Sequence, residues 1–78
     1  MPTLLRQEGY RFFFFSNESQ EPPHVHVEKG SAYAKIWLYP LELASSSGFK
    51  RGEMRRIREI TSGHQDDFLE AWHAHFGH

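Results

Sequence analysis

One short segment constrains the fold of this chain more than any other. Residues 24–29 alternate histidine with valine before a glutamate and a lysine, and residues 32–38 form a second run rich in apolar side chains. Gly30 and Ser31 separate the two runs, and a two-residue connection with glycine first is typical of a type II′ hairpin turn. The segment therefore predicts two antiparallel strands, 24–29 and 32–38, joined by a tight turn.

The turn also predicts the register of the hairpin. Successive side chains of a strand point to opposite faces, so a slip by one residue would exchange the two faces. With Gly30 and Ser31 in the turn, the apolar cross-strand pairs on one face are Val25/Ile36 and Val27/Ala34. The pairs on the other face are His24/Trp37, His26/Lys35 and Glu28/Tyr33. We therefore expect the first face to meet the core and the second to carry the function.

The segment before the hairpin predicts two more strands. Residues 3–6 read as a short strand, and Gly9 ends the turn that follows. Residues 10–15 are aromatic-rich and bounded by turn residues, which is typical of a strand. In such a strand Phe12 and Phe14 face one side of the sheet and Phe13 and Phe15 the other. A strand that is apolar on both sides is expected to be covered on both sides.

The C-terminal third changes to a helical period. Residues 39–44 predict a turn or one short helical turn, with Pro40 suited to a first helical position, and residues 45–48 predict a loop. An apolar stripe with steps of three and four then follows: Met54, Ile57, Thr61, His64, Phe68, Trp72 and Phe76. The stripe keeps its phase, so we expect one helix over about 51–76, with 62–63 as the place for a kink, rather than two separate helices. The opposite helix face is expected to be solvated and carries Arg51, Arg55, Arg56 and Arg58.

These elements predict an α+β fold in one domain, residues 1–78: an antiparallel sheet of three to four strands with a long C-terminal helix on one face. A chain of 78 residues has a small core, which supplies only about 3–5 kcal/mol. There is no cysteine, as is usual in a reducing compartment, and no apolar run approaches the length of a membrane span. We expect a soluble cytoplasmic protein with no membrane partner.

The chain also resembles a known family. The residues that carry the resemblance are Arg11 to Glu18 (RFFFFSNE), Glu21 to Glu28 (EPPHVHVE), Leu43 to Ser46 with Gly48-Phe49, and Phe68 to Phe76. They are similar to the signature of domain of unknown function family 4160, a family of small bacterial proteins. The resemblance implies short stand-alone proteins whose genes often lie beside another small domain, in arrangements suggestive of toxin–antitoxin pairs. It implies no established activity and no catalytic residues.

The candidate binding surface is the polar and aromatic side of the predicted sheet. Its members are Arg11, Phe13, Phe15, His24, His26, Glu28, Tyr33, Lys35 and Trp37. Aromatic residues and arginine are enriched in protein interfaces, and a second chain would supplement a small core. The first hypothesis is therefore a protein-interaction module, either a homo-oligomer or the partner of a small protein encoded by a neighbouring gene.

Two alternatives use the same side chains. Aromatic planes stack RNA bases and cations neutralise phosphate, so an RNA-binding protein or ribonuclease toxin would use His24, His26 and Lys35 as its candidate catalytic groups. A net charge of −1 argues against this reading. Alternatively, His24 and His26 could share a zinc ion, with a third ligand from Glu18, Glu28 or a helix histidine. Lys35 opposite His26 would repel that ion, and no cofactor is predicted. No catalytic residue is assigned, and whether the protein is an enzyme stays open.

Overall fold

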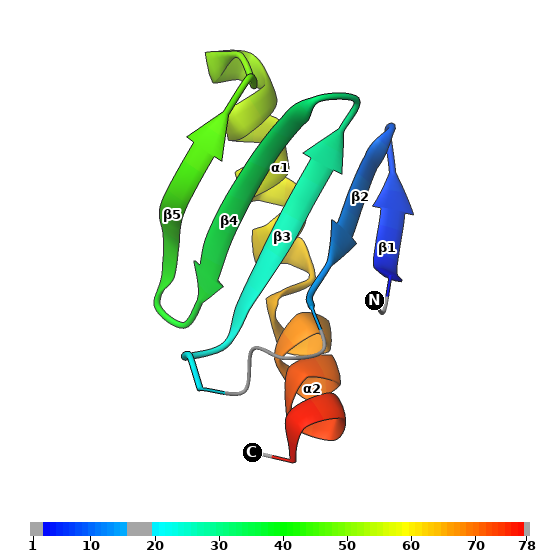
Figure 1. Cartoon of the computed structure of the whole chain (residues 1–78), viewed down its shortest axis with the longest axis vertical. Coiled ribbons are helices and arrows are strands. Elements are labelled where there is room, and N and C mark those ends of the chain that lie inside the picture. Colours follow the sequence, from blue (N-terminus) through cyan, green and yellow to red (C-terminus); the bar gives the residue numbers. More distant parts are fainter. Residues whose placement is uncertain (1–2, 16–19, 78) are drawn as a thin grey trace.

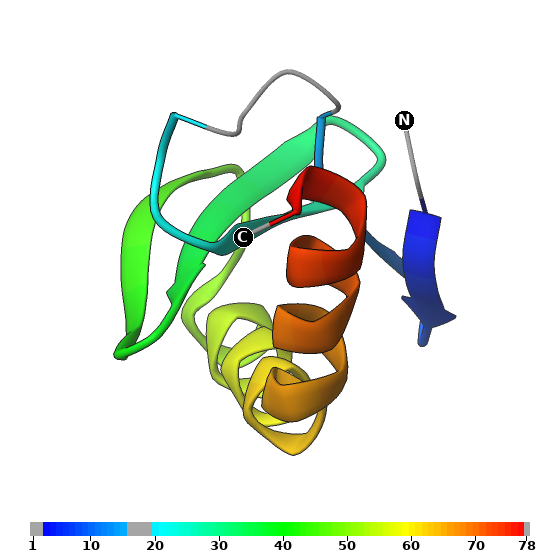
Figure 2. The ribbon, with the colours of Figure 1, turned by 90° about the horizontal axis from the view of Figure 1, so that it is seen from below.

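The fold is an antiparallel sheet followed by two helices. The computed structural model describes residues 3–15 and 20–77, and over these residues the sheet has five strands in the order of the sequence. The elements are β1 (Thr3–Gln7), β2 (Tyr10–Phe13), β3 (His24–Lys29), β4 (Ala32–Leu38), β5 (Leu41–Ser47), α1 (Arg51–Gly63) and α2 (Gln65–Phe76). Each strand pairs with the next one along the chain, and both helices lie on the same face of the sheet (Figures 1 and 2). The α+β class is confirmed.

The β3–β4 hairpin has the predicted bounds and the predicted register. All six cross-strand pairs are present, from His24 opposite Trp37 to Lys29 opposite Ala32. Gly30 has a φ of 60°, which glycine adopts without strain. The pairing continues one step further, because the Leu38 amide donates to the Pro23 carbonyl at 3.0 Å. The register of the hairpin therefore determines both which side chains face the core and which side chains form the candidate site.

The core lies between the sheet and the helices. Its buried strand residues are Tyr10, Phe12, Val25, Val27, Ala34, Ile36 and Leu38, and its buried helix residues are Ile57, Ile60 and Phe68. The Phe12 ring stacks on Phe68, with 5.7 Å between the ring centroids. Phe14 also faces the helices, against Trp72, while Phe13 and Phe15 lie on the other side beside His26. The predicted division of the four phenylalanines between the two faces is confirmed, although β2 ends at Phe13.

The prediction for residues 39–48 was wrong. Leu41–Ser47 form a fifth strand, β5, in place of a helical turn and a loop. Tyr39 and Pro40 make the tight turn, so that Leu41 pairs with Leu38 and Leu43 with Ile36. Proline favours a tight turn as well as a helix start, and the serines that follow have little intrinsic preference for a strand. Pairing with β4 therefore decides the structure of this segment.

The prediction of one continuous helix was also wrong. The helices are separated at His64, whose φ of −115° and ψ of 15° are not helical. The His64 amide is shared between the carbonyls of Ile60 and Thr61, at 3.1 and 3.2 Å. The Thr61 hydroxyl donates to the Ile57 carbonyl at 2.8 Å, an arrangement that bends helices, and Gly63 weakens the same turn. As a result α2 extends past the end of the sheet, where Trp72 contacts Phe14.

Neither of the two helices in the described part of the chain is long and apolar enough to cross a membrane.

An exposed ion pair links α1 to the turn between β1 and β2. The Arg56 guanidinium donates to both carboxylate oxygens of Glu8, and it also contacts Glu59. Hydrogen bonding from Arg56 lowers the pKa of the Glu8 carboxyl below its ordinary value of 4.5.

Replacing two glycines should have opposite effects on stability. Gly48 has a φ of 88°, and a Cβ there would lie 3.1 Å from the Ala32 Cα, so Gly48→Ala should cost about 1–3 kcal/mol. A Cβ on Gly63 meets nothing within 4 Å, so Gly63→Ala should stabilise α1 by up to about 1 kcal/mol. Urea denaturation measures both changes, and two shifts of the same sign would contradict the described backbone.

The ion pair between Glu8 and Arg56 predicts part of the acid sensitivity. Because the pKa of Glu8 is lowered in the folded chain, its contribution is present above about pH 4.5 and is lost as the pH falls through the folded pKa. Glu8→Gln should therefore lose less stability than the wild type between neutral pH and about pH 3. Glu70→Gln is the matched control, because Glu70 is exposed on α2. Equal acid sensitivity in the wild type and Glu8→Gln would contradict the assignment.

Candidate functional site

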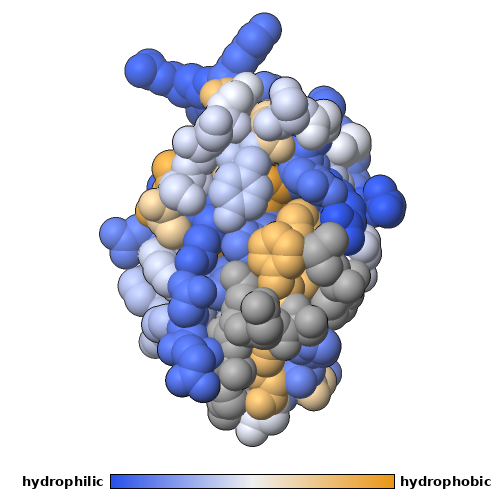
Figure 3. Space-filling view, viewed as in Figure 1, coloured by the Kyte–Doolittle hydropathy of each residue, from blue (hydrophilic) through white to orange (hydrophobic). Residues whose placement is uncertain are grey.

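The predicted site residues lie together on the face of the sheet that points away from the helices. We call this side the outer face, and its aromatic and charged side chains the outer-face cluster: Arg11, Phe13, Phe15, His24, His26, Glu28, Tyr33, Lys35 and Trp37. Figure 3 views this side and shows an apolar patch near the middle of the molecule, with hydrophilic surface to its left. Neither described helix covers the outer face (Figure 2).

His26 is the centre of the cluster. Its ring stacks on Phe13 and on Tyr33 at an interplanar angle of 28° in both pairs, with centroid distances of 5.5 and 5.7 Å. The edges of Phe15 and His24 approach the same ring at 4.7 and 5.0 Å. The rings come from β2, the residues after it, β3 and β4, so the cluster ties together the central part of the sheet.

Both histidines of β3 are buried and hydrogen-bonded. His24 is 0% exposed, and its Nδ1 donates to the Pro22 carbonyl at 2.9 Å. His26 is 3% exposed, and a hydrogen bond of 2.7 Å joins its Nδ1 to the Tyr33 hydroxyl. The alternation of β3 predicts that these rings share a face, but it does not predict their burial. Their surroundings are those of packed structural side chains.

The two cations of the cluster are held by carboxylates and aromatic rings. Arg11 lies 2.6 Å from Glu28, and its guanidinium sits 4.4 Å above the Phe13 ring. Lys35 is held in the same way, because its ammonium lies 2.6 Å from the Glu21 carboxylate and 4.6 Å from the Trp37 ring centroid. The outer face therefore carries its positive charges in pairs with negative ones.

Two members of the site were missed in the sequence. Glu21 lies 2.6 Å from the Lys35 ammonium, and the Trp72 ring lies 4.9 Å from His24. No local signal in the sequence places Glu21 beside Lys35, because the chain bends at Glu21 and at Pro23 before β3 begins. Trp72 belongs to the predicted helical stripe, but only the break at His64 takes it around the end of the sheet.

The described residues do not assemble a metal site. No group of three His, Cys, Asp or Glu side chains within residues 3–15 and 20–77 is close enough to hold an ion. Glu28 is bound to Arg11, and His64 lies beside Asp67 on another side of the molecule. Glu18, the other proposed ligand, lies outside the described residues.

These features define a small α+β protein whose sheet packs two helices on one face and carries an aromatic cluster on the other. The family described as Domain of unknown function (DUF4160) matches residues 9–73, and the chain belongs to that family. The match includes β2 to β5, α1 and most of α2, and with them the whole outer-face cluster. Searches of curated proteins and of solved structures give no match.

The hydrogen bond between His26 and Tyr33 should contribute measurably to stability. Tyr33→Phe removes the hydroxyl that meets His26 Nδ1 and should cost about 1 kcal/mol. Tyr39→Phe is the matched control, because Tyr39 is exposed in the β4–β5 turn and its loss should stay within about 0.5 kcal/mol. Equal urea midpoints for the two variants would contradict a structural role for this bond.

Proposed function

We propose that this protein is a protein-interaction module that binds a second protein chain through its outer face. The observation that carries the proposal is a group of partly exposed aromatic rings, Phe15, Tyr33 and Trp37, on the side of the sheet that neither described helix covers. Phe15 is 37% exposed there, and Tyr33 and Trp37 are half-buried. Aromatic side chains of this kind are typical anchors of protein interfaces.

The size of the chain supports the same proposal. A standard interface buries about 800 Å² on each partner, which is about a sixth of the 4734 Å² of accessible surface in this chain. A partner would also stabilise a domain with a small core, because binding to the folded state shifts the folding equilibrium.

The pairing of charges favours a protein partner over RNA. A protein that binds nucleic acid gains most of its affinity from cations that are free to neutralise phosphate. On the outer face, Arg11 is paired with Glu28 and Lys35 with Glu21. An RNA strand would have to displace both carboxylates. A protein interface tolerates such pairs at its rim.

The burial of the histidines favours binding over catalysis at this site. A general acid or base must come within hydrogen-bond reach of the substrate. His24 and His26 already use Nδ1 for hydrogen bonds and are enclosed by rings. The ribonuclease alternative would therefore need a rearrangement of β3 or its neighbours. The zinc alternative would need both rings to turn toward one ion beside Lys35.

We place the interaction in the bacterial cytoplasm, with two partners that fit the surface. One is a second copy of the chain, and the other is a small protein encoded by a neighbouring gene, as in a toxin–antitoxin pair. Both place the outer face against a protein surface. A growth assay separates the toxin version from a simple dimer.

A charge placed in the middle of the outer face should weaken the complex. Phe15→Glu should raise the dissociation constant of the homodimer or of the complex with the neighbour by about tenfold or more, which is about 1.4 kcal/mol. The matched control is Tyr39→Glu, which makes the same kind of change at an exposed aromatic residue outside the cluster. Light scattering measures the dimer, and co-purification after co-expression measures the complex.

Three results would count against the proposal. The first is a monomer at high concentration that retains no neighbouring protein, and the second is an equal loss of binding in Phe15→Glu and Tyr39→Glu. The third is tight binding of single-stranded RNA at physiological salt that Lys35→Ala abolishes.

In the toxin version, expression without the neighbour slows growth, and His26→Ala or Lys35→Ala restores it. Undiminished toxicity in both variants would exclude the outer face from that activity.

A further inference from the structure

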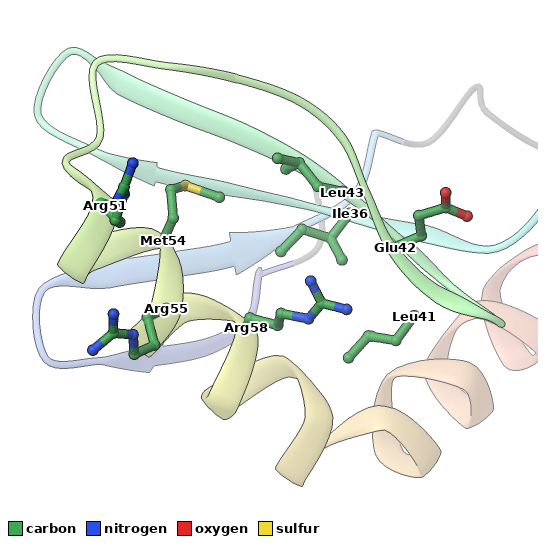
Figure 4. Close-up of a pocket in the computed structure, with 8 residues that line it drawn as sticks. All are labelled: Ile36, Leu41, Glu42, Leu43, Arg51, Met54, Arg55 and Arg58. Carbon is green, nitrogen blue, oxygen red and sulfur yellow. The ribbon is translucent and has the colours of Figure 1, made fainter.

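A groove lies on the other side of the sheet, between β5 and the first half of α1. Its volume is about 320 Å³. It is lined by Ile36, Leu41, Glu42 and Leu43 from the strands and by Arg51, Met54, Arg55 and Arg58 from the helix (Figure 4). None of these residues belongs to the outer-face cluster. A more open depression continues from Leu41 along Arg55 and Arg58 to Glu59, Ser62 and Gly63, and Glu59 is paired with Arg56.

The floor of the groove is aliphatic. Its lining is mostly apolar, and Ile36, Leu41, Leu43 and Met54 are its apolar residues. Leu43 is 47% exposed, which is unusual for a leucine that points to the core side of a sheet. The floor carries no aromatic ring among the described lining residues. Such a surface suits aliphatic side chains better than nucleic-acid bases, which stack on aromatic rings.

Three arginines border the groove at helical positions i, i+4 and i+7. Arg51, Arg55 and Arg58 therefore lie along one side of α1 over about 10 Å. No carboxylate of the described residues forms an ion pair with any of the three. Their neighbour Arg56, by contrast, is bound to Glu8 and Glu59. The groove thus carries the concentration of unpaired positive charge that the outer face lacks.

The close-up view shows how these side chains are arranged. Arg58 extends from α1 toward the strands and ends between Ile36 and Leu41 (Figure 4). Arg51 points toward the strand side at the end of the groove, and Arg55 points outward at its rim. Glu42 also borders the groove, but its carboxylate points away from the three guanidinium groups.

The strand beside the groove is an open edge of the sheet. β5 pairs with β4 on one side only, and six of its seven residues are exposed. Within the described residues, no backbone hydrogen bond joins the outer edge of β5 to another segment. The register shift near Ala44 interrupts the edge, and such bulges limit the length of strand that can be added. The accessible edge beside the groove is therefore the part formed by Leu41–Leu43.

We propose that this groove binds an extended acidic segment of a partner protein. The segment lies in the groove beside β5. The aliphatic side chains on one of its faces pack on Leu41, Leu43 and Met54, and the carboxylates on its other face pair with Arg51, Arg55 and Arg58. Side chains on the same face of an extended chain are about 6–7 Å apart. Two or three carboxylates on one face would therefore span the row of three arginines, which is about 10 Å long. One small anion could reach only a part of this row.

This inference does not depend on the proposed function, because it concerns a different surface. The outer face presents aromatic rings and paired charges, whereas the groove presents aliphatic side chains and unpaired arginines. The edge of β5 and its groove therefore supply a second contact, with a chemically different partner segment. Phe15→Glu should leave binding at the groove unchanged.

A labelled peptide tests the proposal directly. The probe is a short fluorescein-labelled peptide in which glutamate alternates with leucine, titrated with the full chain and followed by fluorescence anisotropy. We expect binding with a dissociation constant below about 1 mM, weakened about tenfold or more in Arg51→Glu and in Arg58→Glu. The matched control is Arg6→Glu, the same charge change at an exposed arginine on β1, at the opposite edge of the sheet. It should bind the peptide as the wild type does.

Several results would overturn the proposal. Absence of binding at about 1 mM peptide is one, and equal binding of a peptide with glutamine in place of glutamate is another. An equal loss in Arg6→Glu would show a general charge effect. Displacement of the peptide by oligouridylate, with the same dependence on Arg51 and Arg58, would assign the groove to RNA. Amide chemical-shift changes on addition of the peptide that are confined to Leu41–Leu43 and α1 would support the proposed peptide site. Changes confined to the outer face would contradict it.

Discussion

The register of the β3–β4 hairpin is the constraint on which the rest of the structure depends. Val25 and Val27 are fully buried against the helices, while His24 and His26, which alternate with them, are buried on the other side. A slip by one residue would put two imidazoles into the aliphatic core and two valines into the outer-face cluster. The turn at Gly30-Ser31 and the packing of both faces therefore select the same pairing. One local feature fixes the core and the candidate site together.

The two faces of the sheet are stabilised in different ways. The inner face is a conventional apolar core closed by α1 and α2, whereas the outer face is held by stacked rings, hydrogen bonds to histidine and cations over aromatic rings. Ring contacts of this kind contribute about 0.5–1.5 kcal/mol each beyond simple burial. The outer face is thus a firm, preorganised surface. Preorganisation favours binding because little conformational entropy remains to be lost.

The sequence predicted the elements whose local signals agree with their tertiary surroundings. The hairpin has both alternation and a turn signal, so its bounds and register are confirmed. β5 was missed because Leu41–Ser47 lacks strand-forming residues and becomes a strand only by pairing with β4. The break at His64 was missed because the apolar stripe keeps its phase across it. The site residues share a face as predicted. The burial of His24 depends on Trp72, which no local pattern brings to β3.

The central claim is that the outer face is a protein-binding surface. Its most direct test is the map of amide chemical-shift and cross-saturation effects in the complex, with the chain isotopically labelled and its partner unlabelled. In the homodimer, the two kinds of subunit are mixed. The account predicts that the affected amides cluster on β2, β3 and β4, around Phe13, His26 and Lys35. Effects confined to α2 or to the β1 edge, with the outer face unchanged, would contradict it.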